Sequence, residues 1–117
     1  MEQIVLHFIG DFLLQNNWMA KNKAGFHFIG WAACFVHCFI YALPFLFYLS
    51  ITGVSLVFLT HFVIDKFRVA YYWTIFFKID KNEPENKELS FFLVFLVDIT
   101  LHFATNFFIF QYFYKTL

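Results

Sequence analysis

Four long apolar segments make up most of this chain, and each carries ionisable side chains near its middle. The segments cover about residues 3–20, 26–49, 54–77 and 89–114. Each approaches or exceeds the roughly 20 residues that a helix needs to cross the hydrocarbon core of a bilayer. Pro44 should kink the second segment or end its regular helix near Leu43. The length and number of these segments predict a chain that folds inside a membrane.

Composition supports lipid as the solvent of these segments. Hydrophobic residues make up 62% of the 117 residues and aromatic residues 26%, against about 45–50% apolar residues in soluble domains. A soluble domain of this size has too little interior to hide that much apolar surface. The net charge is zero, which gives no indication of a nucleic-acid partner. We therefore expect one domain over residues 1–117, an all-α four-helix transmembrane bundle.

Basic residues predict how the bundle lies in the membrane. All but one of them belong to the first and third connections or their edges: Lys21, Lys23, Lys66, Arg68, Lys78, Lys81 and Lys87. Only Lys115 lies on the other side. The positive-inside rule then places these connections in the cytoplasm and both termini outside. The N-terminus lacks the basic region of a signal peptide, so we expect the first segment to remain as a membrane helix.

Histidine and aspartate pairs recur at helical spacing inside the apolar segments. They are His7 and Asp11, His61 and Asp65, and Asp98 and His102; His37 lies in the middle of the remaining segment. Residues four apart project from one face of a helix. At about 1.5 Å per residue, all seven fall within a slab roughly 10 Å thick near the bilayer middle. Because the topology used only lysine and arginine, this agreement in depth independently predicts one shared polar site.

The chemistry of this cluster favours a metal. Helical bundles build one-metal and two-metal sites from inward-facing acids and histidines, and zinc accepts imidazole and carboxylate ligands. We predict a divalent metal, with zinc favoured, held by a subset of these ligands: His7, His37, His61, Asp65, Asp98 and His102. Asp11 is the predicted general base. Two alternatives remain open, namely a proton or ion relay and a hydrogen-bond network that holds the helices together, at about 0.6 kcal/mol per bond.

Three polar residues near the cytoplasmic side are candidates for substrate binding. Gln15 follows Asp11 by one helical turn and can hydrogen-bond a substrate or simply be solvated at the interface. Lys23 and Arg68 can attract an anionic headgroup, although the positive-inside rule alone also accounts for them.

Several motifs resemble those of an uncharacterised family of small integral membrane proteins of bacteria and phages. They are H-x-x-G-D-F-x-x-Q at residues 7–15, a lone histidine in the second helix, H-x-x-x-D at residues 61–65 and D-x-x-x-H at residues 98–102. The resemblance implies a four-helix fold and an inner-membrane location, and it carries no agreed activity. A weaker likeness, through H-x-x-x-D, is to membrane-bound metal-dependent hydrolases.

The function predicted from these observations is a membrane-embedded metal-binding protein, specifically a metal-dependent hydrolase that acts on a lipid-linked or amphipathic ester. One rival is a transporter or channel with a His/Asp relay. Another is a phage-type membrane interaction protein without catalysis. The expected partners are the lipid bilayer and a lipid-like or anionic substrate, and an oligomer is compatible with the sequence.

Overall fold

Helices form the regular structure of the chain in a computed structural model that describes residues 1–77 and 87–115. The elements are α1 (Glu2–Phe8), the π-helix η1 (Ile9–Leu13), α2 (Asn17–Asn22), α3 (Phe28–Ala42), the 3-10 helix η2 (Leu43–Phe47), α4 (Ile51–Lys66), α5 (Val69–Phe77) and α6 (Lys87–Phe113). An isolated antiparallel bridge pairs Leu49 with Tyr114. The all-α prediction is confirmed for the part of the chain that the structure describes.

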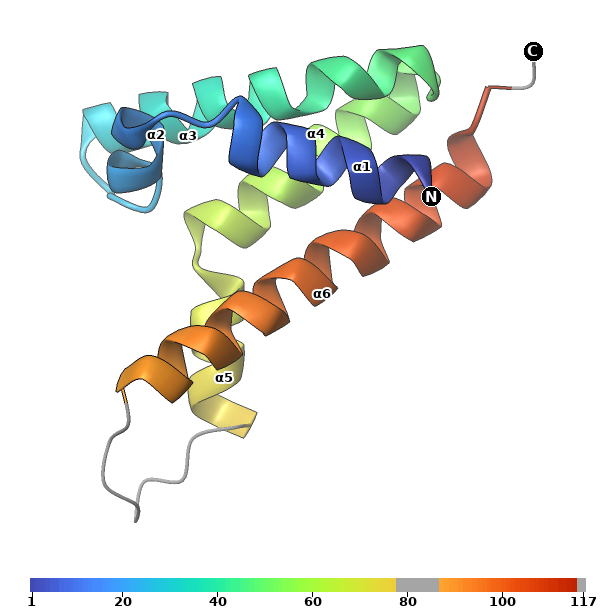
Figure 1. Ribbon diagram of the computed structural model, residues 1–117. Helices are drawn as coiled ribbons and strands as arrows, with labels where there is room; N and C mark the ends of the chain where they lie inside the picture. The colour runs from blue at the N-terminus through green and yellow to red at the C-terminus, as the bar shows by residue number, and fades with distance from the viewer. Residues whose placement is uncertain (78–86, 116–117) are drawn as a thin grey trace.

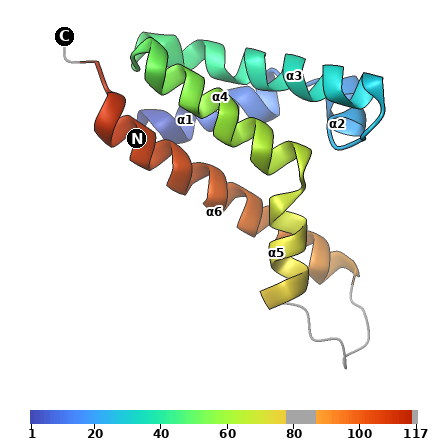
Figure 2. The same cartoon turned by 180° about the vertical axis from the view of Figure 1, so that it is seen from behind.

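Helix α4 occupies the middle of the fold. It packs against α3 on one side and α6 on the other, and both views show it between these two helices (Figures 1 and 2). Helix α1 lies across the C-terminal half of α6, and α5 packs against the N-terminal part of α6. The elements α1, α3, α4 and α6 therefore surround one common interior.

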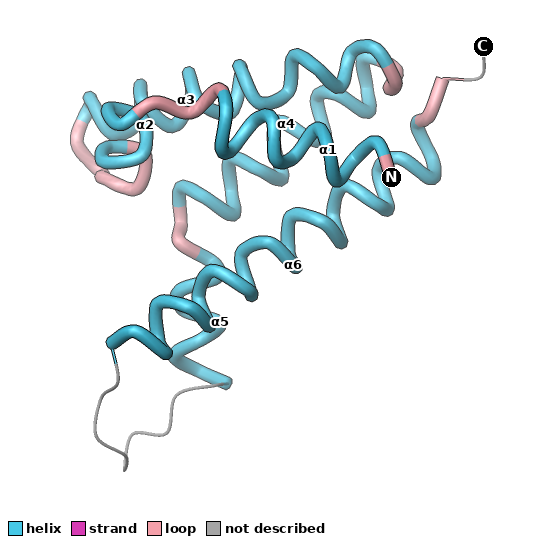
Figure 3. Tube along the Cα trace, viewed as in Figure 1, coloured by secondary structure: helices cyan, strands magenta, loops and turns pink. Residues whose placement is uncertain are grey.

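Two of the four expected segments are broken, so the described residues contain six α-helices where four were expected. Residues 14–16 separate η1 from α2, and a second short break separates α4 from α5 (Figure 3). At the first break the Asn16 side chain accepts a 2.9 Å hydrogen bond from the Met19 backbone N–H and so starts a new helix. At the second, Arg68 has a φ of 51°, which no continuous helix allows.

The second segment behaves as its proline predicts. Helix α3 ends at Ala42, and a 3-10 helix with Pro44 in its first turn continues to Phe47. Proline lacks the backbone N–H that an α-helix would use at this point, so the regular α-helix ends at Ala42, two residues before Pro44.

Several polar side chains are buried in the interior, while apolar ones cover much of the outside. Phe28, Phe47 and Phe76 are 86%, 81% and 79% exposed. Four of the five histidines are 1% exposed: His7, His37, His61 and His102. Soluble monomeric proteins rarely expose so many large apolar side chains. Where such a surface is exposed, it marks contact with a partner or a membrane.

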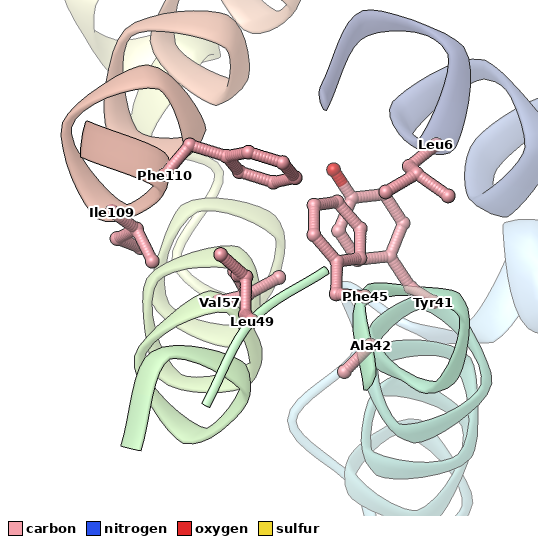
Figure 4. Packing of buried hydrophobic residues seen from close by; sticks show 8 residues of the cluster. All are labelled: Leu6, Tyr41, Ala42, Phe45, Leu49, Val57, Ile109 and Phe110. Carbon is pink, nitrogen blue, oxygen red and sulfur yellow. The ribbon is translucent and has the colours of Figure 1, made fainter. Parts of the chain in front are cut away.

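A compact apolar cluster lies next to the buried polar groups. It joins residues of α1, α3, α4 and α6 through the following side chains: Leu6, Tyr41, Ala42, Phe45, Leu49, Val57, Ile109 and Phe110 (Figure 4). The Tyr41 hydroxyl extends from this cluster toward the polar interior. Tyr41 therefore belongs both to the apolar core and to the polar site.

Two helical stretches are long and apolar enough to cross a membrane. They are Phe28–Phe47 and Glu88–Phe113, and the second has only 17% of its most apolar window buried. The first and third segments do not reach this length as continuous helices because of their breaks. The part of the predicted loop at residues 78–86, with Lys78 and Lys81, lies outside the described residues.

Candidate metal centre

The structure brings the seven predicted His and Asp side chains together from five elements. His7 lies in the last turn of α1 and Asp11 in the π-helix η1. His37 comes from α3, His61 and Asp65 from α4, and Asp98 and His102 from α6, where each pair shares one face of its helix. The four-residue spacing therefore positions these groups as the sequence predicts.

Four ligand atoms converge at the centre of this cluster. His37 Nε2 lies 2.9 Å from His61 Nε2 and 3.2 Å from both Asp11 Oδ1 and Asp65 Oδ2. His61 Nε2 lies 3.4 Å from Asp11 Oδ1 and 3.3 Å from Asp65 Oδ2. A tetrahedron with metal–ligand bonds of 2.0–2.1 Å has edges of about 3.3–3.4 Å. The four atoms thus have the spacing of a tetrahedral metal site.

Protons are too few to satisfy these four atoms by hydrogen bonding alone. If both Nε2 atoms carried hydrogens, the two hydrogens would collide across 2.9 Å. If only one carries a hydrogen, that hydrogen can join the two Nε2 atoms, and Lys23 Nζ donates to Asp65 Oδ2 at 2.7 Å, so Asp11 Oδ1 is left without a donor. Asp11 Oδ1 is indeed buried without a hydrogen-bond partner of good geometry. A cation at the centre would satisfy all four lone pairs together, so the donor set fits a divalent metal.

A second set of ligand atoms lies beside the first. Atoms of Asp11, Asp98 and His102 are all within 4.8 Å of one another. His102 Nε2 is 3.2 Å from Asp65 Oδ1 and 3.5 Å from Asp98 Oδ1. His7 Nε2 lies 3.5 Å from Asp11 Oδ2. The two sets are therefore joined through the carboxylates of Asp11 and Asp65.

The sequence reasoning missed Tyr41, which organises one side of the cluster. Its hydroxyl is 2.8 Å from His7 Nδ1 and accepts a 2.8 Å hydrogen bond from Asn106 Nδ2. Its ring stacks on the His61 imidazole with a centroid separation of 3.7 Å. The sequence could have indicated Tyr41 and its partner Asn106 through their spacing. Tyr41 follows His37 by four residues and Asn106 follows His102 by four, so each shares a helix face with a cluster histidine.

Gly10 explains how Tyr41 reaches this position. A Cβ atom at residue 10 would overlap the Tyr41 ring, so only glycine allows η1 and α3 to approach this closely. The π-helix also widens the backbone at Asp11, and such turns occur often at functional sites.

Lys23 reaches the cluster from the connection between α2 and α3. Its Nζ donates to Asp65 Oδ2 at 2.7 Å and to Gln15 Oε1 at 2.8 Å. Burial disfavours the charged ammonium, but the nearby carboxylates of Asp65 and Asp11 outweigh it and raise the pKa of Lys23. Lys23 therefore places a positive charge beside the cluster, and Gln15 supports it.

Lys66 holds the backbone that carries Lys23. It is fully buried, and its Nζ donates to the carbonyl oxygens of Lys23 and Gly25. The same ammonium lies 4.3 Å from the centre of the Trp31 ring. Lys66 therefore holds the connection between α2 and α3 in place, a role that its use in the positive-inside argument did not predict.

The basic residue Arg68, the two cysteines and the fifth histidine lie apart from the ligand sets. Arg68 is exposed at the break between α4 and α5, with its guanidinium 4.3 Å from the Tyr71 ring centre. Cys34 and Cys38 are buried free thiols with sulfur atoms 3.9 Å apart, and they belong to neither ligand set. His27 caps α3 by accepting a hydrogen bond from the Gly30 N–H.

Comparison with known protein families identifies the family to which the chain belongs. Residues 1–117 match the family described as Protein of unknown function (DUF3307). The chain belongs to this family. Searches of curated proteins and of solved structures each returned no significant match. The prediction of an uncharacterised family is confirmed, and any assignment of function depends on the site itself.

Proposed function

We propose that this protein is a membrane-embedded hydrolase that uses one divalent metal, held by His37, His61 and Asp65, to cleave a lipid-linked or amphipathic ester. The observation that carries the proposal is the convergence of four buried ligand atoms at tetrahedral spacing, among which Asp11 Oδ1 has no hydrogen-bond partner. Catalytic zinc sites have three protein ligands and keep one position for water. Imidazole and carboxylate ligands in this geometry favour zinc among the divalent metals.

Asp11 is the proposed general base. Its side chain is 14% exposed, compared with 4% for Asp65 and 1% for His37, so it faces the accessible side of the cluster. Its Oδ1 lies at the fourth vertex, where a catalytic site holds water. A small rotation of the carboxylate would let water occupy that vertex while Asp11 accepts its proton.

The proposed reaction is ordinary ester hydrolysis. When bound, the metal would polarise the ester oxygen and make the attacking water more acidic. The water oxygen bonds to the ester carbon or phosphorus, and its proton passes to the Asp11 carboxylate. The bond to the leaving alcohol oxygen then breaks, and protonated Asp11 returns the proton to that oxygen. The products are an acid and an alcohol, and Asp11 ends as it began.

Lys23 and Gln15 are proposed to hold the anionic part of the substrate. Lys23 Nζ is at the edge of the cluster, and its side chain is 22% exposed. An ammonium at this place can form charge-assisted hydrogen bonds with a phosphate or carboxylate. Arg68 would contribute only through long-range attraction, because its side chain lies at the break after α4.

The exposed apolar surface and the two long apolar helices support a membrane location. We propose that all four segments enter the bilayer as a bundle, with both termini outside, in the inner membrane of a bacterium or as a phage product within it. Broken helices at membrane depth are tolerated where other protein groups pair the freed backbone, and at this break the Asn16 side chain accepts from the Met19 backbone N–H.

Metal analysis tests the proposal directly. Wild-type protein purified in detergent should retain close to one tightly bound zinc per chain and hydrolyse a long-chain nitrophenyl ester. His61→Ala should lose both the metal and the activity. His27→Asn is the matched control, because it removes an exposed imidazole, keeps a capping oxygen for α3 and should change neither. Protein that neither contains metal nor gains activity with added zinc would overturn the proposal.

One observation favours a second candidate, a proton relay. Ring nitrogens and carboxylates form a continuous series of close contacts with the following members: Asp98, His102, Asp65, His37, Asp11 and His7. A relay would conduct protons in liposomes without metal and would be insensitive to a chelator. Proton conduction and its response to a chelator, measured on the same purified protein, therefore distinguish a relay from a hydrolase.

A further inference from the structure

We infer that the cluster holds a second divalent ion on Asp98, His102 and His7, joined to the first site by the Asp65 carboxylate, and that this ion binds together with a phosphate-bearing ligand. The inference rests on the proposed metal site at His37 and His61 and extends it to a two-metal centre.

The two oxygens of Asp65 serve different sets of ligands. Oδ2 lies 3.2 Å and 3.3 Å from the Nε2 atoms of His37 and His61, whereas Oδ1 lies 3.2 Å from His102 Nε2. A carboxylate that bonds one ion through each oxygen holds the two ions about 3.5–4 Å apart, the spacing of two-metal hydrolases. Asp65 is 4% exposed, and its Oδ2 also accepts a 2.7 Å hydrogen bond from Lys23 Nζ.

The second position has its own ligands. Asp98 Oδ1 lies 3.5 Å from His102 Nε2, and Asp11 completes a group within 4.8 Å. Ligand atoms in cis positions around an octahedral ion are about 3 Å apart and those in trans positions about 4.2 Å, for metal–oxygen bonds near 2.1 Å. The 3.5 Å between Asp98 Oδ1 and His102 Nε2 lies between these two values, and the carboxylate ligands suit an ion that prefers oxygen, such as Mn²⁺.

His7 supplies an independent indication that a ligand is missing. Its side chain is 1% exposed, yet its Nε2 atom is buried without a hydrogen-bond partner and lies 3.5 Å from Asp11 Oδ2. Its other nitrogen is 2.8 Å from the Tyr41 hydroxyl. If Nδ1 carries the hydrogen and donates it to the Tyr41 oxygen, the Nε2 lone pair is free for a metal.

Charge explains why the second ion should bind together with an anion. The three aspartates contribute minus three, Lys23 plus one and the first divalent ion plus two, so the site with one ion is neutral when its histidines are neutral. A second divalent ion leaves two positive charges in a nearly enclosed interior, which is unfavourable without a counter-charge. A phosphate group would supply it, and Lys23, with its side chain 22% exposed, lies where it can contact that group. This assigns phosphate esters as the substrate class.

Manganese titration of the intact protein in detergent tests the inference. Wild-type chain, first freed of metal, should bind two Mn²⁺ at saturation, and the EPR spectrum should show exchange coupling between neighbouring ions. Inorganic phosphate should tighten the second binding step at least tenfold and leave the first nearly unchanged, because linked ligands strengthen each other. His102→Ala and Asp98→Asn should each bind one uncoupled Mn²⁺, while His27→Asn should behave as wild type.

The outcomes separate the two proposals. Wild type that never exceeds one Mn²⁺, with or without phosphate, overturns the second ion but leaves the first site intact. Two ions without exchange coupling, or a second ion retained in His102→Ala, also overturn it, because the ions would then not share this cluster. Phosphate that leaves the second step unchanged removes the assigned substrate class. No metal binding at all overturns both proposals.

Discussion

Asp11 differs from its neighbours because it touches both ligand sets and remains the most accessible member of the central four. If it acts as the base, Asp11→Asn should keep the metal at His37 and His61 and lose activity by about 10²–10⁴-fold, the usual contribution of a positioned base. Asp65→Asn should instead lose the metal, because both Asp65 oxygens are proposed ligands that lie 3.2 Å from histidine Nε2 atoms. Metal content and hydrolysis rate, measured together on both variants, distinguish a base from a ligand. Metal loss in Asp11→Asn would mean that Asp11 is a ligand and not the base.

Lys23 gives a prediction about substrate charge. Lys23→Met removes the ammonium beside Asp65 and keeps a side chain of similar length. A lost charge-assisted hydrogen bond of about 1.5–3 kcal/mol should raise KM for a phosphate ester by roughly 10- to 100-fold, with a much smaller effect on an uncharged ester. Lys21→Met, at an exposed position on α2, is the control and should leave both KM values unchanged. Equal effects of Lys23→Met on the two esters would mean that Lys23 supports the fold and does not bind the anion.

The residues of the cluster were predictable because side chains four residues apart in the sequence lie on the same face of a helix. The three His/Asp pairs are four residues apart, and depth estimates placed His37 with them. Tyr41 was not predicted because a tyrosine in an apolar helix normally packs in the core, as this one also does. The role of Lys66 was also missed, since the bond from its ammonium to the Gly25 carbonyl depends on how two distant turns meet.

At the scale of elements, the contact between η1 and α3 depends on Gly10. Gly10→Ala would place a methyl group against the Tyr41 ring, and the displacement should cost about 1–3 kcal/mol as overpacking. Because Tyr41 contacts His7 and stacks on His61, this variant should also weaken metal binding. Gly53→Ala is the matched control: its methyl group would meet Phe113 between α4 and α6, so it should lower thermal stability without changing metal affinity. Unchanged metal affinity in Gly10→Ala would show that Tyr41 does not position the ligands.

Segment limits were predictable from the sequence, but the breaks within segments were not. The residues on either side of Gln15 and Asn16, and on either side of Arg68, are largely apolar, so each stretch was expected to be one continuous segment. The structure begins new helices there because Asn16 caps α2 and Arg68 takes a left-handed backbone conformation. Pro44 was different, since its missing N–H acts locally and ends α3 wherever the helix packs.

On the scale of the whole molecule, a buried polar cluster beneath an exposed apolar surface supports the proposed membrane location, and the basic residues predict the orientation of the chain. Asn82→Cys, in the loop outside the described residues, should be protected from an impermeant maleimide in intact spheroplasts and should react after permeabilisation. Lys115→Cys should react in both conditions, because the termini are expected outside. Cys34 and Cys38 are buried and should add little background. The reverse pattern would invert the topology and place Lys23 and the accessible edge of the metal site on the outer face. Protection of both cysteines until permeabilisation would place both of them on the inner side and contradict the predicted location of the C-terminus.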